Sequence, residues 1–226
     1  MKIHDVFELS IPEIRVIQFA RFRDDRGYFT EHYRRSDFEQ LGPDNFMSGI
    51  EFVQMNMSFS RAGTIRGLHF QWNPYMGKLV RTLQGRMVDL VLDIRRDSPT
   101  FGQAIACDMP ADPDADIDQW IWVPPGFAHG NYFPEDTTIE YLCSGEYSPG
   151  CEAGISPFSR DIDWSPTSPD LVSMLNEARE NNPRITDKDR NGLTLEQWAV
   201  DPRSDHFLLS SLDQRHAVGA STERQS

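Results

Sequence analysis

Apolar and polar residues alternate with a period of two along much of the first half of the chain, as in β-strands that bury one face. Residues 52–59 and 64–71 carry the clearest such pattern, and residues 87–94 are predicted to be a well-buried strand. Shorter predicted strands cover residues 16–19, 28–33, 78–83, 102–109, 120–123, 131–133 and 137–143. Gly, Pro and Asp turns separate these strands, and many short strands with such turns predict an antiparallel sandwich or barrel.

Helices are predicted at only two places. Ser36, with Glu39 three residues later, has the capping-box pattern and predicts a short helix over 36–41. A longer helical pattern follows at 171–180. Because no long helix interrupts the strands before that point, βαβ units are disfavoured. We therefore expect an all-β jelly-roll sandwich with a few short helices, mainly C-terminal.

The domain is predicted to span residues 1–190, since 226 residues suit one large domain. Residues 191–226 form a C-terminal extension to which the sequence assigns no role. Its last part, 215–226, lacks apolar periodicity, and we expect it to be a frayed tail. The acidic segment 111–118 is expected to be an exposed loop.

The charge balance is strongly acidic, with 22 Lys and Arg against 35 Asp and Glu and a formal net charge of −13. Nucleic acids and anionic membranes require a basic surface, so we expect neither as a partner. No segment resembles a signal peptide, and none approaches the roughly 18 apolar residues of a membrane helix. Three cysteines without a CxxC motif predict free thiols in a reducing cytoplasm.

The densest candidate chemistry lies in the predicted strand 64–71. Strand alternation places His69 and Gly67 on one face and Arg66 on the other. A β-bulge at Gly67 would turn Arg66 toward the site of His69. Taken alone, the segment favours a core histidine and a surface arginine.

Two further segments add a lysine and a histidine. Lys78 begins the predicted strand 78–83 and is either a solvated strand-edge cation or a contact to an anion. His129 stands between Ala128 and Gly130, whose small side chains allow close approach of a ligand. A lone histidine of this kind is more often structural than functional.

Several common chemistries lack their motifs. Metal sites on β-barrels of this kind use two or three histidines with an HxH pair on one strand, but residue 71 is Gln71. A metal site is therefore disfavoured. The chain also has no Walker A loop, no GxGxxG after a strand and no GxSxG elbow, so ATP hydrolysis, dinucleotide redox chemistry and serine hydrolysis by those routes lose support.

Taken together and in order, the motifs resemble a known family. They are DDRGYFTE at 24–31, FVQMN at 52–56, IRGLHFQ at 65–71, GKLVR at 77–81, DIR at 93–95, SPTFG at 98–102 and PGFAHG at 125–130. The set resembles the dTDP-4-dehydrorhamnose 3,5-epimerases and related enzymes that epimerise nucleotide-linked 4-keto sugars, over residues 5–190. This resemblance implies a cupin-like jelly roll, a homodimer that exchanges N-terminal strands, and no metal or organic cofactor.

The resemblance also implies catalytic roles. Epimerisation beside a ketone needs a base, a group that stabilises the enolate oxygen, and an acid across the ring. His69 matches the family's base and Tyr141 its acid. Asp189 in the segment 186–189 matches the carboxylate that orients the base, with Asp187 as the alternative. Lys78 and Arg66 would face the C4 oxygen and the pyrophosphate.

The implied substrate contacts come from several segments. The resemblance places Arg26, Phe29 and Glu31 at the nucleotide from the exchanged strand, Gln54, Met55 and Asn56 along the pocket, His129 at phosphate, Tyr147 against the base, and Glu152 and Lys188 at the edge of the site. The cations among these residues predict a local positive cleft on an acidic protein.

The chain departs from the family's pattern at Met55, at Leu142 and over residues 153–159. We expect these changes near the nucleotide and sugar edges of the site. They leave open an epimerase that inverts one carbon, or one that uses a GDP- or CDP-linked sugar. A sugar-nucleotide-binding protein without activity and a metal-dependent cupin oxygenase are the further alternatives.

Overall fold

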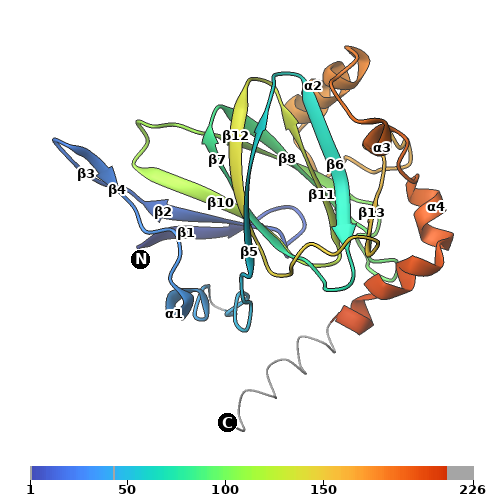
Figure 1. The fold of residues 1–226 in the computed structure, drawn as a ribbon, viewed down its shortest axis with the longest axis horizontal. Coiled ribbons are helices and arrows are strands. Elements are labelled where there is room, and N and C mark those ends of the chain that lie inside the picture. The colour runs from blue at the N-terminus through green and yellow to red at the C-terminus, as the bar shows by residue number, and fades with distance from the viewer. Residues whose placement is uncertain (1, 43, 213–226) are drawn as a thin grey trace, which may run out of the picture.

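Two antiparallel sheets face each other in the computed structural model, which describes residues 2–42 and 44–212 (Figure 1). The first sheet runs in the order β1 (Ile3–Glu8), β2 (Arg15–Ala20), β10 (Ile117–Val123), β7 (Lys78–Gln84), β12 (Thr137–Cys143) and β5 (Gln54–Ser60). The second runs β13 (Glu152–Gly154), β6 (Thr64–Gln71), β11 (Phe127–Phe133), β8 (Arg86–Asp93) and β9 (Ala104–Pro110). The predicted all-β sandwich is confirmed.

The core between the sheets is built from alternate residues of facing strands. Val80 and Ile139 of the first sheet and Val91 and Phe133 of the second are fully or almost fully buried in one cluster. Because successive side chains of a strand point to opposite faces, this packing also fixes which neighbours point into the interior. The register of the apolar residues thus determines which polar side chains enter the space between the sheets.

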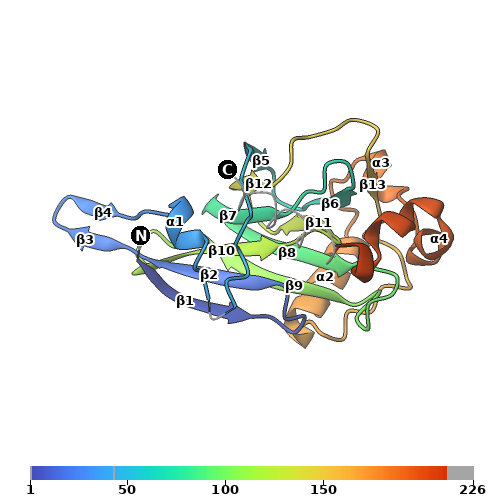
Figure 2. The same cartoon turned by 90° about the horizontal axis from the view of Figure 1, so that it is seen from below.

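The outer face of each sheet is covered by chain that is not sheet. Residues 30–52, with the short helix α1 (Arg35–Phe38), supply Phe38, Leu41 and Met47 to a cluster outside the first sheet. Helix α2 (Pro169–Glu180) lies beside β9 of the second sheet (Figure 2). The bounds of α2 are close to those of the predicted helix, 171–180. Further along the chain come α3 (Asp187–Arg190), α4 (Leu195–Val200) and the 3₁₀ helix η1 (Pro202–Phe207).

The first helix begins earlier than the sequence pattern predicts. Its N-cap is Arg34, without a side-chain cap, and Ser36 lies inside the helix with its Oγ near Asp37. The predicted Ser36–Glu39 capping box is therefore wrong. A capping box instead opens α4, where Thr194 and Gln197 cap each other's backbone N–H groups.

The C-terminal extension packs against the second sheet as far as the structure describes it. Trp198 and Phe207 are 0% and 1% exposed, and their rings lie 4.6 and 5.3 Å from that of Phe70 on β6. The indole N–H of Trp198 donates to the Ile94 carbonyl at 3.0 Å. Residues 191–212 therefore share a buried cluster with the outer face of the second sheet. The predicted frayed tail, 215–226, lies outside the described residues.

A small hairpin of β3 (Phe22–Asp24) and β4 (Gly27–Phe29) projects from the body (Figure 1). The strand β4 is shorter than the predicted strand 28–33. Phe22, Tyr28 and Phe29 on the hairpin are 51%, 47% and 67% exposed, which is unusual for aromatic side chains in a monomer.

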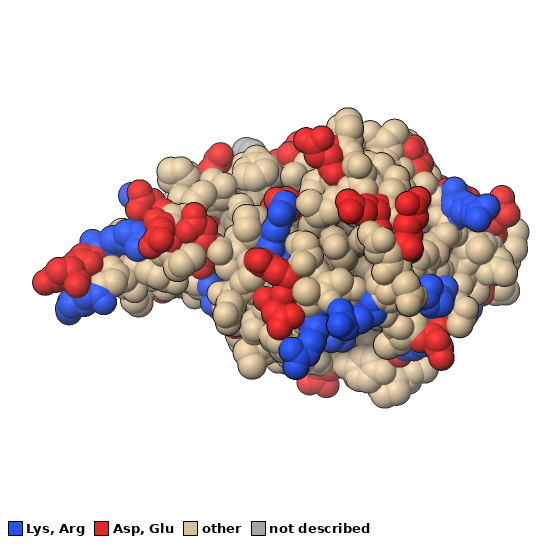
Figure 3. All heavy atoms as spheres, turned by 90° about the horizontal axis from the view of Figure 1, so that it is seen from above, with Lys and Arg blue, Asp and Glu red and all other residues tan. Residues whose placement is uncertain are grey.

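Charged side chains of both signs are interspersed over the face seen in Figure 3, including the projecting hairpin. This face presents no broad basic field of the kind that nucleic-acid binding requires. No helix among the described residues is long and apolar enough to cross a membrane. All three cysteines are free, as expected.

Candidate active site

The site is formed by inward-facing positions of five neighbouring strands. Gln54 and Asn56 come from β5, Arg66 and His69 from β6, Lys78 from β7, His129 from β11, and Tyr141 from β12. They line two adjoining cavities of about 440 and 320 Å³ that share His69, Lys78 and Tyr141. The strand alternation read from the sequence thus brings most of the expected residues together.

A β-bulge at Gly67 is the reason that Arg66 and His69 share one face. His129 pairs with His69 and Asn131 with Arg66, so Gly130 alone lies opposite two residues of β6. Gly67 has φ +101°, and a Cβ atom there would lie 2.6 Å from the Gly130 Cα. Only glycine fits both this backbone and this spacing. The predicted bulge is confirmed, and Arg66 lines the same cavity as His69.

The imidazole of His69 is held by a carboxylate from the other end of the chain. Nε2 of His69 lies 2.7 Å from Oδ1 of Asp189, whose Oδ2 accepts the Gly67 N–H at 3.2 Å. Thr186 caps α3 by accepting the Asp189 N–H, which fixes the carboxylate. Burial opposes ionisation of Asp189, but the hydrogen bonds from His69 and the backbone outweigh it and lower the pKa of this carboxyl. Asp187, the alternative, is exposed and outside both cavities.

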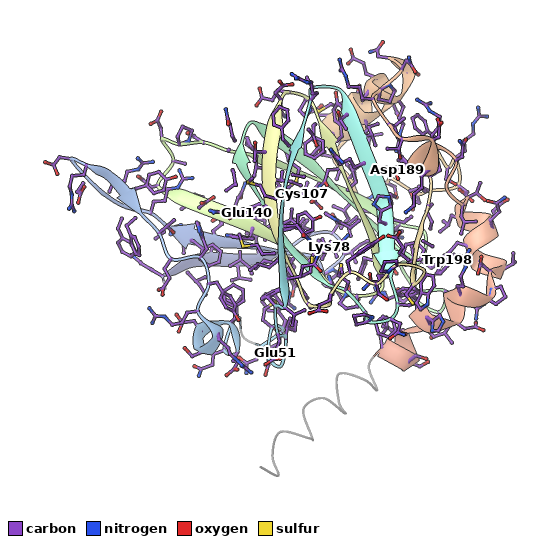
Figure 4. All side chains as sticks on the ribbon, viewed as in Figure 1. Glu51, Lys78, Cys107, Glu140, Asp189 and Trp198 are labelled. Carbon is purple, nitrogen blue, oxygen red and sulfur yellow. The ribbon has the colours of Figure 1, made fainter. Side chains whose placement is uncertain are left out.

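Lys78 lies in a central strand near the middle of the sandwich, with Asp189 beside β6 (Figure 4). The interpretation of Lys78 as a solvated strand-edge cation is therefore wrong. Burial lowers the pKa of the Lys78 ammonium, and the nearby Cys143, Asp89 and Glu152 oppose part of this effect. An ammonium in such surroundings gains strongly from an anionic oxygen placed in the cavity.

Tyr141 faces the same cavity from β12. Burial raises the pKa of its phenol, while a hydrogen bond with Asn56 and the charge of Arg66 offset this only in part. The phenol therefore stays protonated at neutral pH and can donate a proton. Asn56 also donates to Sγ of the buried Cys143 at 3.6 Å and accepts from Gln54 at 3.1 Å.

The pocket contains a second histidine–carboxylate pair, half of which the sequence analysis missed. Nε2 of His129 lies 2.7 Å from Oδ2 of Asp89, and these side chains are 7% and 0% exposed. Asn131 donates to the same oxygen at 3.0 Å, while Asp89 Oδ1 has no hydrogen-bond partner in the described structure. The available signal was an acidic residue at an inward position of the apolar strand 87–94. The carboxylate fixes the orientation of the His129 ring.

The outer end of the site is a polar cluster around Glu152 on β13. Its Oε1 accepts from Lys188 Nζ at 2.8 Å and from the Tyr147 hydroxyl at 3.1 Å. Burial raises the pKa of Glu152, but these two donors and the charge of His69 outweigh it, so the net shift is downward. The backbone N–H of Tyr147 donates to Gln54 at 2.8 Å.

Most of the residues predicted to form a positive cleft lie in one cavity. Arg66, Lys78, Lys188 and His129 line one cavity. Arg26, Phe29 and Glu31 belong to the hairpin and the chain after it, and they line neither cavity of the single chain. Arg26 instead pairs with Asp24 on its own hairpin.

Three of the residues at which the chain departs from the family's pattern have side chains that point away from the pocket. Met55 is 58% exposed on the outward face of β5, so the prediction that its side chain lines the pocket is corrected. Leu142 packs into the cluster outside the first sheet. Ser159, with Asp161, contacts the start of α4 through the Leu195 N–H. The expectation that these changes lie at the nucleotide and sugar edges is therefore wrong for these side chains.

The fold is a cupin-like β-sandwich, and one cavity brings together a histidine–aspartate pair, a buried lysine and a tyrosine, which are residue types that suit acid–base chemistry. Among the described residues, no group of three or more His, Cys, Asp or Glu is arranged to hold a metal ion.

Comparison with known proteins gives a consistent answer. The profile of the dTDP-4-dehydrorhamnose 3,5-epimerase family matches residues 8–197. The curated dTDP-4-dehydrorhamnose 3,5-epimerase of Shigella flexneri is 35% identical over 208 residues, covering 90% of this chain and 99% of that protein.

Two solved structures extend the likeness to the fold. The dTDP-6-deoxy-D-glucose-3,5-epimerase of Legionella pneumophila, in complex with dTDP-4-keto-L-rhamnose, matches with a TM-score of 0.72 at 29% identity, covering 88% of this chain and 96% of its own. The rmlC epimerase of Mycobacterium tuberculosis matches with a TM-score of 0.71 at 29% identity, covering 97% and 99%. The chain belongs to the dTDP-4-dehydrorhamnose 3,5-epimerase family and is an isomerase of the epimerase type.

Proposed function

We propose that the protein inverts C3 and C5 of a dTDP-linked 4-keto-6-deoxy sugar, without a cofactor, and yields dTDP-4-dehydrorhamnose from dTDP-4-dehydro-6-deoxyglucose. The observation that carries this proposal is the arrangement of the His69–Asp189 pair, Lys78 and Tyr141 around one cavity. The family membership and the dTDP-sugar names of the relatives support the substrate class.

The proposed chemistry is proton transfer through an enolate. His69 removes the proton from C5 or C3, the electron pair of that C–H bond forms a C=C bond to C4, and the π pair of the carbonyl moves to the C4 oxygen, which carries the negative charge. Asp189 stabilises the imidazolium that forms. Lys78 stabilises the enolate oxygen. Tyr141 then gives a proton to the opposite face of the carbon, the carbonyl re-forms, and solvent restores both groups.

The polar groups flanking the acid–base residues suit a nucleoside diphosphate. Arg66 and His129 are proposed to contact the pyrophosphate from the cavity that they line together. Tyr147 is proposed to stack on the base, because its ring is 54% exposed at the mouth of the pocket while its hydroxyl is fixed by Glu152.

We also propose a cytoplasmic homodimer that exchanges N-terminal strands. The exposed aromatic side chains of the β3–β4 hairpin need a partner surface. The outward face of the edge strand β5 offers one, since Met55, Met57 and Phe59 on it are more than half exposed. Exchange would bring Arg26, Phe29 and Glu31 to the nucleotide of the other protomer. Residues 191–212 are proposed to form part of the same catalytic domain.

The alternatives receive less support. Met55, Leu142 and Ser159 point away from the cavities, so they give no reason to expect a single inverted carbon or a GDP- or CDP-linked sugar. A binding protein without activity would have no use for the buried Lys78 beside the His69–Asp189 pair.

The proposal is tested by identifying the product. Incubation with dTDP-4-dehydro-6-deoxyglucose, followed by NMR of the sugar, should give dTDP-4-dehydrorhamnose, with no loss of rate in EDTA. A product inverted at one carbon would select the mono-epimerase. Turnover of a GDP- or CDP-linked sugar alone would replace the nucleotide assignment.

A further inference from the structure

We infer that Gln71 is a positioning residue that holds Tyr147 at the mouth of the pocket. The inference deepens the proposed function, because it rests on Tyr147 contacting the nucleotide. Gln71 ends β6 two residues after His69, and its side chain is directed to the same side of the sheet. In the sequence, Gln71 stands where an HxH metal-binding pair would have its second histidine.

The carboxamide of Gln71 binds the main chain of two separate loops. Its Nε2 donates to the Pro74 carbonyl at 2.9 Å and to the Glu146 carbonyl at 2.9 Å. Its Oε1 accepts the Ser148 N–H at 2.9 Å. Both N–H bonds and the oxygen are thus used, and the group is 5% exposed. No other side chain of this size donates two hydrogen bonds and accepts a third in this geometry.

These contacts hold the main chain on either side of Tyr147 in the sequence. The carbonyl before it and the N–H after it bind Gln71, while its own N–H binds Gln54. The ring itself is 54% exposed, so packing contributes little to its position. Hydrogen bonds to the backbone therefore fix the loop, and the bond of the hydroxyl to Glu152 fixes the ring, before a ligand arrives, which reduces the ordering cost of binding.

The loop is also tied to the turn that leads to Lys78. A Cβ atom on Gly145 would lie 2.6 Å from the Tyr75 carbonyl, which shows how closely the two segments approach. Ser144 Oγ accepts the Gly77 N–H at 2.7 Å. Gln71 bonds to both segments at the place where they meet, so it connects the outer and inner ends of the pocket.

A thermodynamic cycle between Gln71 and Tyr147 tests this role. Gln71→Met keeps the side-chain length but removes the hydrogen bonds, and Gln71→Glu keeps an acceptor for Ser148 in case the first variant folds poorly. Either replacement should weaken dTDP binding about tenfold in the native background, since it leaves buried backbone groups unpaired. In a Tyr147→Ala background the same replacement should change the dTDP affinity less than twofold.

Two further readouts separate this role from general damage. Proton exchange at saturating substrate should change far less than the dTDP affinity, because His69 and Lys78 are untouched. Gln103→Met, at a partly buried amide outside the cavities, is the matched control and should leave dTDP affinity unchanged.

Amide hydrogen exchange of the protein without ligand tests the contact independently of function. The Ser148 N–H should exchange faster in Gln71→Met than in the native protein. An unchanged Ser148 rate, or an equal loss of dTDP affinity with and without Tyr147, overturns the inference. A native protein that binds no dTDP overturns the proposed nucleotide contact, and the exchange rate of Ser148 still decides whether Gln71 holds the loop.

Discussion

Oδ1 of Asp189 lies 2.7 Å from Nε2 of His69, although the two residues are 120 positions apart in sequence. The same carboxylate accepts the Gly67 N–H, so it fixes both the histidine and the bulge that aims it. The proposed acid–base centre is thus assembled when the C-terminal third of the chain returns to β6.

Replacing Asp189 by Asn should therefore slow epimerisation by about 10²- to 10⁴-fold. The imidazolium of His69 loses the negative charge beside it, while the size and shape of the side chain at position 189 are kept. Initial rates of dTDP-sugar turnover measure the effect. Asp187→Asn is the matched control on the same short helix, since Asp187 is exposed, and its rate should be native. Equal losses in both variants would exclude a specific role of Asp189.

Tyr141→Phe should separate proton removal from inversion. His69 still removes a proton and can return a solvent proton to the same face, but the acid across the ring is gone. We expect deuterium to enter the sugar from D₂O while net inversion falls by about 10²-fold or more. NMR follows both processes in one sample. Native inversion in this variant would remove Tyr141 from the mechanism.

The activity should fall on the basic side at a pH below the ordinary pKa of lysine, 10.5, because burial lowers the pKa of Lys78 and, in the proposed mechanism, only its charged form stabilises the enolate. Tyr141 has its pKa raised, so its loss of a proton follows at higher pH. Lys78→Arg should move the basic limb of the rate profile to higher pH, whereas Lys78→Met should abolish activity.

The same lowered pKa has a consequence for stability. The folded state disfavours the charged form of Lys78, so this cost is present below the folded pKa and disappears above the unfolded pKa. Stability from this group therefore rises with pH between the two values. Urea unfolding across this interval should show the rise in the native protein and not in Lys78→Met.

Gly67→Ala should destabilise the fold and displace the acid–base residues. The new Cβ atom would lie 2.6 Å from Gly130, at a φ of +101° that L residues rarely adopt. We expect a loss of about 2–5 kcal/mol in unfolding free energy from strain and overpacking together. Gly150→Ala has positive φ but meets nothing within 4 Å, so it isolates the backbone strain, about 1–2 kcal/mol. Similar losses in both variants would contradict a tight contact at the bulge.

The family resemblance predicted most of the pocket, and strand alternation is the physical reason that these residues come together. Lys78, His129 and Tyr141 lie at inward positions because Val80, Phe127 and Ile139, two residues away from them, are buried between the sheets. The same alternation turns Met55 outward, since it stands between Gln54 and Asn56. The resemblance implied that Met55 lines the pocket, but the structure follows the alternation.

Other features depend on contacts distant in sequence, which a local pattern does not contain. Asp89 interrupts an apolar strand, but its partner His129 is 40 residues away. The choice between Asp187 and Asp189 is made by the docking of a short helix on β6. Ser156 and Ser159 form hydrogen bonds with the chain at Arg190 and Leu195. No motif in the sequence predicted that the C-terminal extension packs on the second sheet through Trp198.

The most direct test of the account is solvent exchange at the sugar carbons. The enzyme is incubated in D₂O with dTDP-4-dehydro-6-deoxyglucose, and NMR reads the deuterium at C3 and C5. The account predicts deuterium at both carbons with the native enzyme and at neither with His69→Asn. Absence of deuterium from both carbons with the folded native enzyme would contradict it.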